Sequence, residues 1–144
     1  MADESIPYNL CSATPDEAEI LNEKMDAFNG RQLSFCGEVE ELENYVIKDK
    51  ENIIAGIKIC LYFRECMFIS VLFVDEQYRG KGLGSWLLQY AEDKAKSIGI
   101  KLVHLDTFDF QAKDFYFKHG YEIFGVLHDC PKGHKRYYLK KILN

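Results

Sequence analysis

The chain has 144 residues, of which 47% are hydrophobic and 28% are charged, and its formal net charge at pH 7 is −5. This length predicts one domain spanning residues 1–144 with a substantial core, and the composition argues against a disordered chain. The negative charge disfavours a nucleic-acid partner, and no apolar stretch reaches the length of a membrane span.

The first residues of the chain and its cysteines suggest a compartment. Residues 1–5 lack the basic and apolar regions of a signal peptide, and the five cysteines include no Cys-x-x-Cys motif. We therefore expect a cytoplasmic protein with reduced thiols. His128, Cys130 and His134 faintly resemble a metal cluster, but a proline and a glycine between them favour a turn, so we expect no metal.

The N-terminal part is expected to begin with a strand over residues 6–11. Thr14 then has the position of a helix N-cap, and Glu17 completes a capping box. Apolar residues recur at helical spacing until Asn29 and Gly30, where we expect the helix to end. Residues 31–43 fit either a short second helix or a loop.

The remaining elements alternate between strands and helices. Segments 44–48, 52–63 and 67–74 are rich in Ile, Val, Phe and Tyr, which indicates an antiparallel meander. The pattern then predicts a helix with one apolar face, a strand, a short helix and two final strands. These are expected at residues 82–97, 100–108, 111–119, 121–127 and 135–142.

A glycine-rich run, Arg79-Gly80-Lys81-Gly82-Leu83-Gly84, joins a predicted strand to a predicted helix. Glycines let backbone N–H groups turn toward a ligand, and a helix N-terminus adds unpaired N–H groups and a positive dipole end. The run is therefore a candidate cradle for a phosphorylated cofactor.

The spacing of the glycines distinguishes between cofactors. A Walker A loop is excluded because its first glycine and its Ser or Thr are missing. In a dinucleotide-binding loop the third glycine would come one residue later. Asp106 does lie about twenty residues on, as that motif requires, but only about forty residues follow it, too few for the rest of a doubly wound sheet.

A third pattern fits the run. Arg79, Gly82 and Gly84 resemble the Arg-x-x-Gly-x-Gly pyrophosphate-binding signature of the GCN5-related N-acetyltransferases. Downstream, the sequence is similar to that family's second signature. Its matching positions are Asp109, Ala112, Phe115, Tyr116, Gly120 and Tyr121. The two motifs stand in the family's order and at its usual separation.

The resemblance implies a fold and a cofactor. The fold would be α/β, with a twisted, mostly antiparallel central sheet of about six to seven strands flanked by about four helices. The co-substrate would be acetyl-CoA, with no metal. In the family, backbone groups of the strand before the loop bind the pantetheine arm, and the matching positions are Leu72, Phe73 and Val74. The remaining cofactor-binding residues implied are Arg79, Gly80, Lys81, Gly82, Leu83, Gly84, Ser85, Asp109 and Ala112.

Two positions of the second signature carry most of the chemistry. The resemblance implies that Tyr116 is the general acid that protonates the departing thiolate; by periodicity alone it would read as a core aromatic. Asp109 stands where the family usually has Asn, and a carboxylate accepts hydrogen bonds but cannot donate them. We therefore favour Asp109 as the cap of the helix near Gln111 over a cofactor contact.

The general base is left open. Asp75, Glu76, His104, Asp106 and His119 all lie near the motifs, and removal of the proton through water is an alternative. Side chains two apart on a strand share a face, so His104 and Asp106 are expected to belong to the site together or not at all.

The resulting prediction is an N-acetyltransferase that acts by direct transfer in a ternary complex. The acceptor would be a small-molecule or peptide amine, with no nucleic acid and no membrane, and the enzyme a monomer or homodimer. The alternatives are a non-catalytic module that binds CoA for sensing and, less favoured, a dinucleotide-dependent reductase.

Overall fold

The computed structural model describes residues 7–33 and 40–144, which fall into two compact units, Met1–Cys36 and Gly37–Asn144. In the first unit, helix α1 (Pro15–Gln32) begins with the expected capping box. The Glu17 N–H donates to Thr14 Oγ1 at 3.2 Å, and the Thr14 N–H donates to a Glu17 carboxylate oxygen at 2.9 Å.

Two expectations for this unit are wrong. The helix runs through Gly30 to Gln32, because Gly30 keeps a helical backbone and the Leu33 N–H closes the last turn on the Asn29 carbonyl at 3.1 Å. Residues 7–11 contain no strand, since the described residues of this unit, 7–33, hold no other strand with which they could pair. Ile6 and residues 34–39 of the ambiguous stretch lie outside the described residues.

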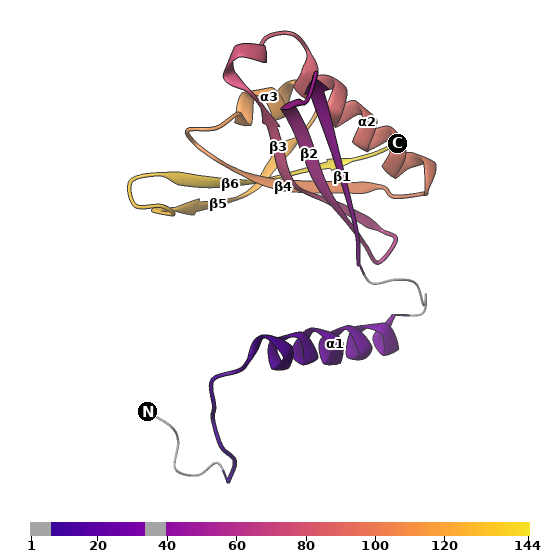
Figure 1. The fold of residues 1–144 in the computed structure, drawn as a ribbon, viewed down its shortest axis with the longest axis vertical. Coiled ribbons are helices and arrows are strands. Elements are labelled where there is room, and N and C mark those ends of the chain that lie inside the picture. The colour runs from indigo at the N-terminus through magenta and orange to yellow at the C-terminus, as the bar shows by residue number, and fades with distance from the viewer. Residues whose placement is uncertain (1–6, 34–39) are drawn as a thin grey trace. The chain divides into compact units, whose positions relative to one another are not determined.

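The second unit is built on one mixed sheet (Figure 1). Its elements are β1 (Glu40–Asp49), β2 (Asn52–Tyr62), β3 (Cys66–Val74), a 3-10 turn (Glu76–Tyr78), α2 (Leu83–Ser97), β4 (Leu102–Phe108), α3 (Lys113–Lys118), β5 (Glu122–His128) and β6 (Lys135–Ile142). The strand order is β1-β2-β3-β4-β6-β5, and every pair is antiparallel except β3 and β4. The predicted class is confirmed, with three α-helices in the described residues.

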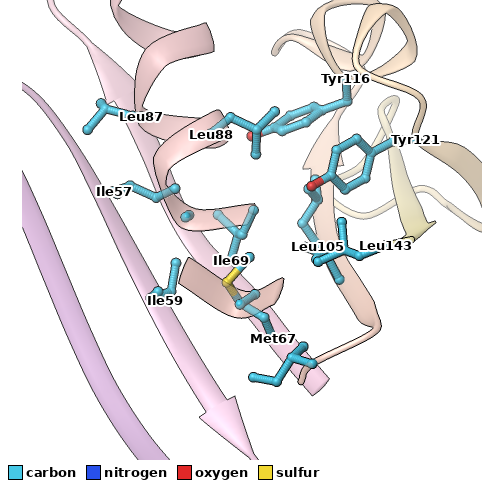
Figure 2. Packing of buried hydrophobic residues seen from close by; sticks show 14 of the residues in the cluster. Ile57, Ile59, Met67, Ile69, Leu87, Leu88, Leu105, Tyr116, Tyr121 and Leu143 are labelled. Atoms are coloured by element: carbon cyan, nitrogen blue, oxygen red, sulfur yellow. The ribbon is translucent and has the colours of Figure 1, made fainter. Parts of the chain in front are cut away.

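One face of the sheet and one face of α2 form the core (Figure 2). Alternate residues of β2 and β4 are buried, as expected where one sheet face is covered. Leu87, Leu88, Ala91 and Ala95 recur at helical spacing and pack against them. In the described residues no helix is both long enough and apolar enough to cross a membrane.

The feature that creates a site is the divergence of β3 from β4. These strands pair only from Cys66–Leu102 to Ile69–Leu105. The register of β3 against β2 shifts after Ile69, and such a bulge bends and twists a strand. The last residues of β3, Ser70 to Val74, therefore leave the edge that faces β4 without a partner strand.

Candidate active site

A cleft of about 810 Å³ opens where β3 and β4 diverge, and we call it the β3–β4 cleft. One side consists of the end of β3, the glycine loop and the first turn of α2; the other consists of β4, the segment that follows it, and α3. Tyr116 and all of the predicted cofactor-binding residues line this cleft except Lys81 and Asp109.

The glycine loop leaves backbone donors free at the N-terminus of α2. Gly82 is the N-cap of α2, with a φ of 84° that only glycine adopts at little cost. Because glycine has no side chain, it makes no capping hydrogen bond to the first N–H groups of the helix. No described residue accepts from the N–H groups of Leu83, Gly84 or Ser85. These donors and the helix dipole make this side of the cleft attractive to an anion.

Gly84 has a different role, because it sets how closely α3 approaches α2. A Cβ at this position would lie 3.4 Å from Cζ of Phe115 and 3.7 Å from a methyl carbon of Val74. The absence of a side chain therefore lets the Phe115 ring of α3 pack directly on the first turn of α2.

The two cations of the loop are placed differently. Arg79 donates through Nε to the Val74 carbonyl at 3.0 Å, which fastens the loop to the end of β3. The Lys81 ammonium lies 5.3 Å from the centroid of the Tyr78 ring and does not line the cleft. Tyr78 in turn donates to the Asp49 carboxylate at 2.7 Å.

Tyr116 is buried, with 7% of its surface exposed, yet it lines the cleft. Burial and then the nearby negative charge of Asp106 raise its pKa to about 12, so the phenol keeps its proton at neutral pH. No described residue forms a hydrogen bond with its hydroxyl. The ring is held edge-on by Phe115 and Tyr121, at centroid distances of 5.2 and 5.7 Å.

Asp109 does not cap α3, so that prediction is wrong. The N-cap is Ala112, without a side-chain hydrogen bond. The Asp109 carboxylate instead accepts from the Lys135 N–H at 3.0 Å and pairs with His134 Nδ1 at 2.9 Å. The physical reason is that the Asp109 N–H bonds the Lys135 carbonyl at 3.0 Å, which continues the β4–β6 ladder and turns the residue toward β6.

The candidate bases are separated by the structure. Asp75, Glu76 and His119 do not line the cleft, and His119 Nε2 instead bonds the Ser85 hydroxyl at 2.9 Å. His104 and Asp106 share a face of β4, but only Asp106 lines the cleft, so the expectation that they belong together is wrong.

The reason lies in where β3 leaves β4. His104 stands in register with Phe68, before the strands part, and bonds the Tyr62 hydroxyl through Nε2. Burial lowers the pKa of this imidazole. Asp106 follows Leu105, the last residue paired with β3, and so opens into the cleft.

Sequence reasoning missed several lining residues. Thr107, Phe110 and Gln111 line the cleft beside Tyr116. The Gln111 side-chain oxygen accepts from the Phe108 N–H at 2.7 Å and from the Thr107 hydroxyl at 3.1 Å, which closes the turn after β4. A glutamine three residues beyond a strand carries no signal of such a bond, so only the folded geometry identifies these residues.

Comparison with known proteins agrees with this geometry. Residues 9–121 match the sequence profile described as the acetyltransferase (GNAT) family. The fold is that of an acetyltransferase. This chain belongs to the GNAT family of N-acetyltransferases.

Three relatives illustrate the match. The crystal structure of an acetyltransferase from Bacillus cereus superimposes with a TM-score of 0.83 and 37% identity, covering 94% of this chain and 98% of that one. Acetyltransferase Atu2258 of Agrobacterium fabrum is 27% identical over 93% of this chain and 97% of its own length. The blasticidin-S acetyltransferase of Streptomyces morookaense is 37% identical over 54% of this chain and 57% of its own.

Proposed function

We propose that this enzyme transfers the acetyl group of acetyl-CoA to a primary amine by direct attack in a ternary complex. The observation that supports it most is that free backbone donors and a protonated phenol lie along one cleft. The first-turn N–H groups of α2 suit a pyrophosphate, and the unpaired edge of β3 suits an extended, amide-bearing arm. Tyr116 lines the same cleft.

When bound, acetyl-CoA supplies an activated acyl carbon and a thiolate leaving group. The amine nitrogen forms a bond to that carbon as the C–S bond breaks, and Tyr116 donates its hydroxyl proton to the departing sulfur. The ammonium loses one proton to solvent before attack, and the nitrogen loses a second proton to solvent as the amide forms. The tyrosinate then regains one proton from solvent, which restores the phenol. A raised pKa suits the donor role, because the phenol stays protonated at working pH.

The acceptor belongs to a small molecule or a peptide, and we place the enzyme in the cytoplasm as a monomer or homodimer. The similarity to a blasticidin-S acetyltransferase makes blasticidin S a sensible first amine to test, beside spermidine and a lysine peptide.

Thermal unfolding and a thiol-release assay test this function. Acetyl-CoA at 100 times its Kd should stabilise the protein by about 2.7 kcal/mol, whereas NADPH should not. Free CoA should then appear only when an accepted amine is added. Stabilisation by NADPH alone, or no response to acetyl-CoA, would contradict the proposal.

A further inference from the structure

An ion pair involves Asp106, which lines the same cleft as Tyr116. Asp106 on β4 and Arg136 on β6 are diagonal neighbours across paired strands, because Asp106 stands opposite Tyr138. Arg136 Nε lies 2.9 Å and Nη2 lies 2.7 Å from Asp106 Oδ1. The two side chains are 33% and 19% exposed, for Arg136 and Asp106 respectively, so the pair is partly shielded from water.

Both bonds from Arg136 end on the same oxygen. No described residue donates to Asp106 Oδ2, so the carboxylate keeps one oxygen for a ligand. The guanidinium is itself held in place, since its central carbon lies 5.5 Å from the ring centroids of both Phe108 and Tyr138. The carboxylate is therefore fixed in orientation, with one acceptor free in a cleft-lining residue.

Asp106 and Tyr116 reach the cleft from opposite faces of the sheet. In β4, Val103, Leu105 and Thr107 are buried on the face that packs with α2, so Asp106 belongs to the other face. Tyr116 belongs to the core on the α2 side. A donor bound along α2 and an acceptor entering from the other face would thus meet in the gap between β3 and β4.

An exposed aromatic ring lies next to this ion pair. Phe110 lines the cleft with 60% of its surface exposed. Its ring stacks on Phe108 with centroids 5.2 Å apart and planes at 8°, and Phe108 is one of the rings that hold Arg136. Phe110 therefore offers an apolar surface to a ligand whose charged end reaches Asp106.

We propose, building on the acetyltransferase function above, that Asp106 Oδ2 binds the ammonium of the acceptor and that Phe110 contacts its apolar part. The acceptors are then primary amines that are cationic at neutral pH and carry an apolar, preferably aromatic, group. A charge-assisted hydrogen bond is stronger than a neutral one, so the site should discriminate between an ammonium and a hydroxyl.

Ligand binding tests this without a known acceptor. Phenethylamine and 2-phenylethanol share the aromatic group and differ in charge, and their affinities can be measured by ligand-observed NMR with and without coenzyme A. The wild type should prefer the amine at least about tenfold, and Asp106→Asn should reduce that preference to about twofold or less. A wild type without preference, or a preference that survives in Asp106→Asn, would overturn the proposal.

Glu122→Gln is the matched control. Glu122 also forms a cross-strand ion pair on this sheet, with Lys140 at 3.9 Å, but it does not line the cleft. This variant removes the same charge and should keep the full preference for the amine. If it loses the preference as Asp106→Asn does, the effect is one of net charge and the assignment of Asp106 is wrong.

Two further measurements separate the claims. Phe110→Ala should weaken phenethylamine about threefold or more and leave ethylamine unchanged; equal losses for both amines would remove Phe110 from the subsite. Acetyl-CoA affinity, measured by calorimetry, should be the same in the wild type and in Asp106→Asn. Failure of the wild type to bind acetyl-CoA would contradict the acetyltransferase function. The role of Asp106 in binding an ammonium would still be decided separately, by the comparison of phenethylamine with 2-phenylethanol.

Discussion

At the scale of single residues, the proposed chemistry depends on one hydroxyl group. Tyr116→Phe keeps the ring contacts with Phe115 and Tyr121 and removes only the proton. We expect folding and acetyl-CoA affinity to be preserved, and turnover to fall by roughly 10²–10⁴-fold, the usual contribution of a general acid. Calorimetry measures the affinity and thiol release with a confirmed amine measures the turnover.

Tyr121→Phe is the matched control for this prediction. Tyr121 donates its hydroxyl to the buried Glu92 at 3.2 Å and lies outside the cleft. Its loss should destabilise the protein by about 1 kcal/mol or more, because a buried acceptor loses a partner, and turnover should stay within about threefold of wild type. Wild-type turnover in Tyr116→Phe would place the acid elsewhere.

Gly82 offers a second test at this scale. A valine at a φ of 84° is strained, although an added Cβ would meet no atom within 4 Å. Relief of the strain should move the N–H groups at the start of α2, so Gly82→Val should weaken acetyl-CoA binding at least about tenfold. Calorimetry of the folded variant measures the change.

The opposite end of the same helix supplies the control. Gly99 has a φ of 87° and is equally open, but it does not line the cleft. Gly99→Val should lose comparable stability and bind acetyl-CoA as the wild type does. Equal losses of affinity in both variants would show that general destabilisation, and not a change in the glycine loop, weakens the binding of acetyl-CoA.

At the scale of elements, the strands and α2 were predictable because each carries a local signal. Alternation and β-branched residues indicate β2, β3 and β4, and β6 is found with the predicted bounds. β1 begins at Glu40 rather than at Asn44. Its first four residues include three glutamates, which are uncommon in strands, so the sequence pattern does not indicate a strand there. Glu43 pairs with Lys94 of α2, a distant partner that local pattern cannot reveal.

The segment after β4 shows where such reasoning fails. Asp109, Gln111 and Ala112 looked like the start of a helix, yet Asp109 is bound to β6 and α3 begins only at Lys113. The competition between a cap and a bond to a strand 26 residues away is decided by tertiary structure. The same holds for Asp106, whose place in the site depends on where β3 turns away.

The bond between Asp109 and β6 predicts a dependence of stability on pH. The Lys135 N–H and then His134 lower the pKa of Asp109, so the folded protein favours the ionised form. This stabilisation is complete above the unfolded-state pKa of about 3.9 and is lost as the pH falls through the lower folded value.

Asp109→Asn should therefore melt at a lower temperature than wild type near pH 7, because the carboxylate charge that accepts from the Lys135 N–H and bonds His134 is gone. The gap between the two melting temperatures should close as the pH falls below about 4. Thermal unfolding between neutral pH and about pH 2.5 measures it. A gap that stays constant down to the lowest pH would mean that the charge of Asp109 is not what stabilises this connection.

At the scale of the whole molecule, a buried charge connects α2 to β6 and to Tyr121, the residue before β5. Glu92 is 1% exposed, and its carboxylate accepts from Lys141 Nζ at 2.7 Å and from the Tyr121 hydroxyl. Lys141→Met leaves this charge buried without its cation. We expect a loss of about 3 kcal/mol in the free energy of unfolding, the lower end for a broken buried pair, because the Lys141 side chain is 26% exposed.

Urea unfolding of the single and double variants measures this loss. Glu92→Gln combined with Lys141→Met removes both charges and keeps an oxygen that can accept from Tyr121. The double variant should recover at least half of the stability lost in Lys141→Met, because no uncompensated charge remains. A double variant no more stable than Lys141→Met would show that the side chain of Lys141 contributes by packing.

The sheet is joined unevenly, and this has a mechanical consequence. β3 and β4 share four residue pairs, whereas β4 and β6 share seven and β1 and β2 share ten. The pairing of β3 with β4 is the weakest in the sheet, so these two strands should separate first when the sheet opens. A ligand that contacts both sides of the β3–β4 cleft links the two strands where they share the fewest residue pairs. Ligand binding should therefore slow amide hydrogen exchange at Ile69 and Leu105 and stiffen the sheet beyond the residues that the ligand touches.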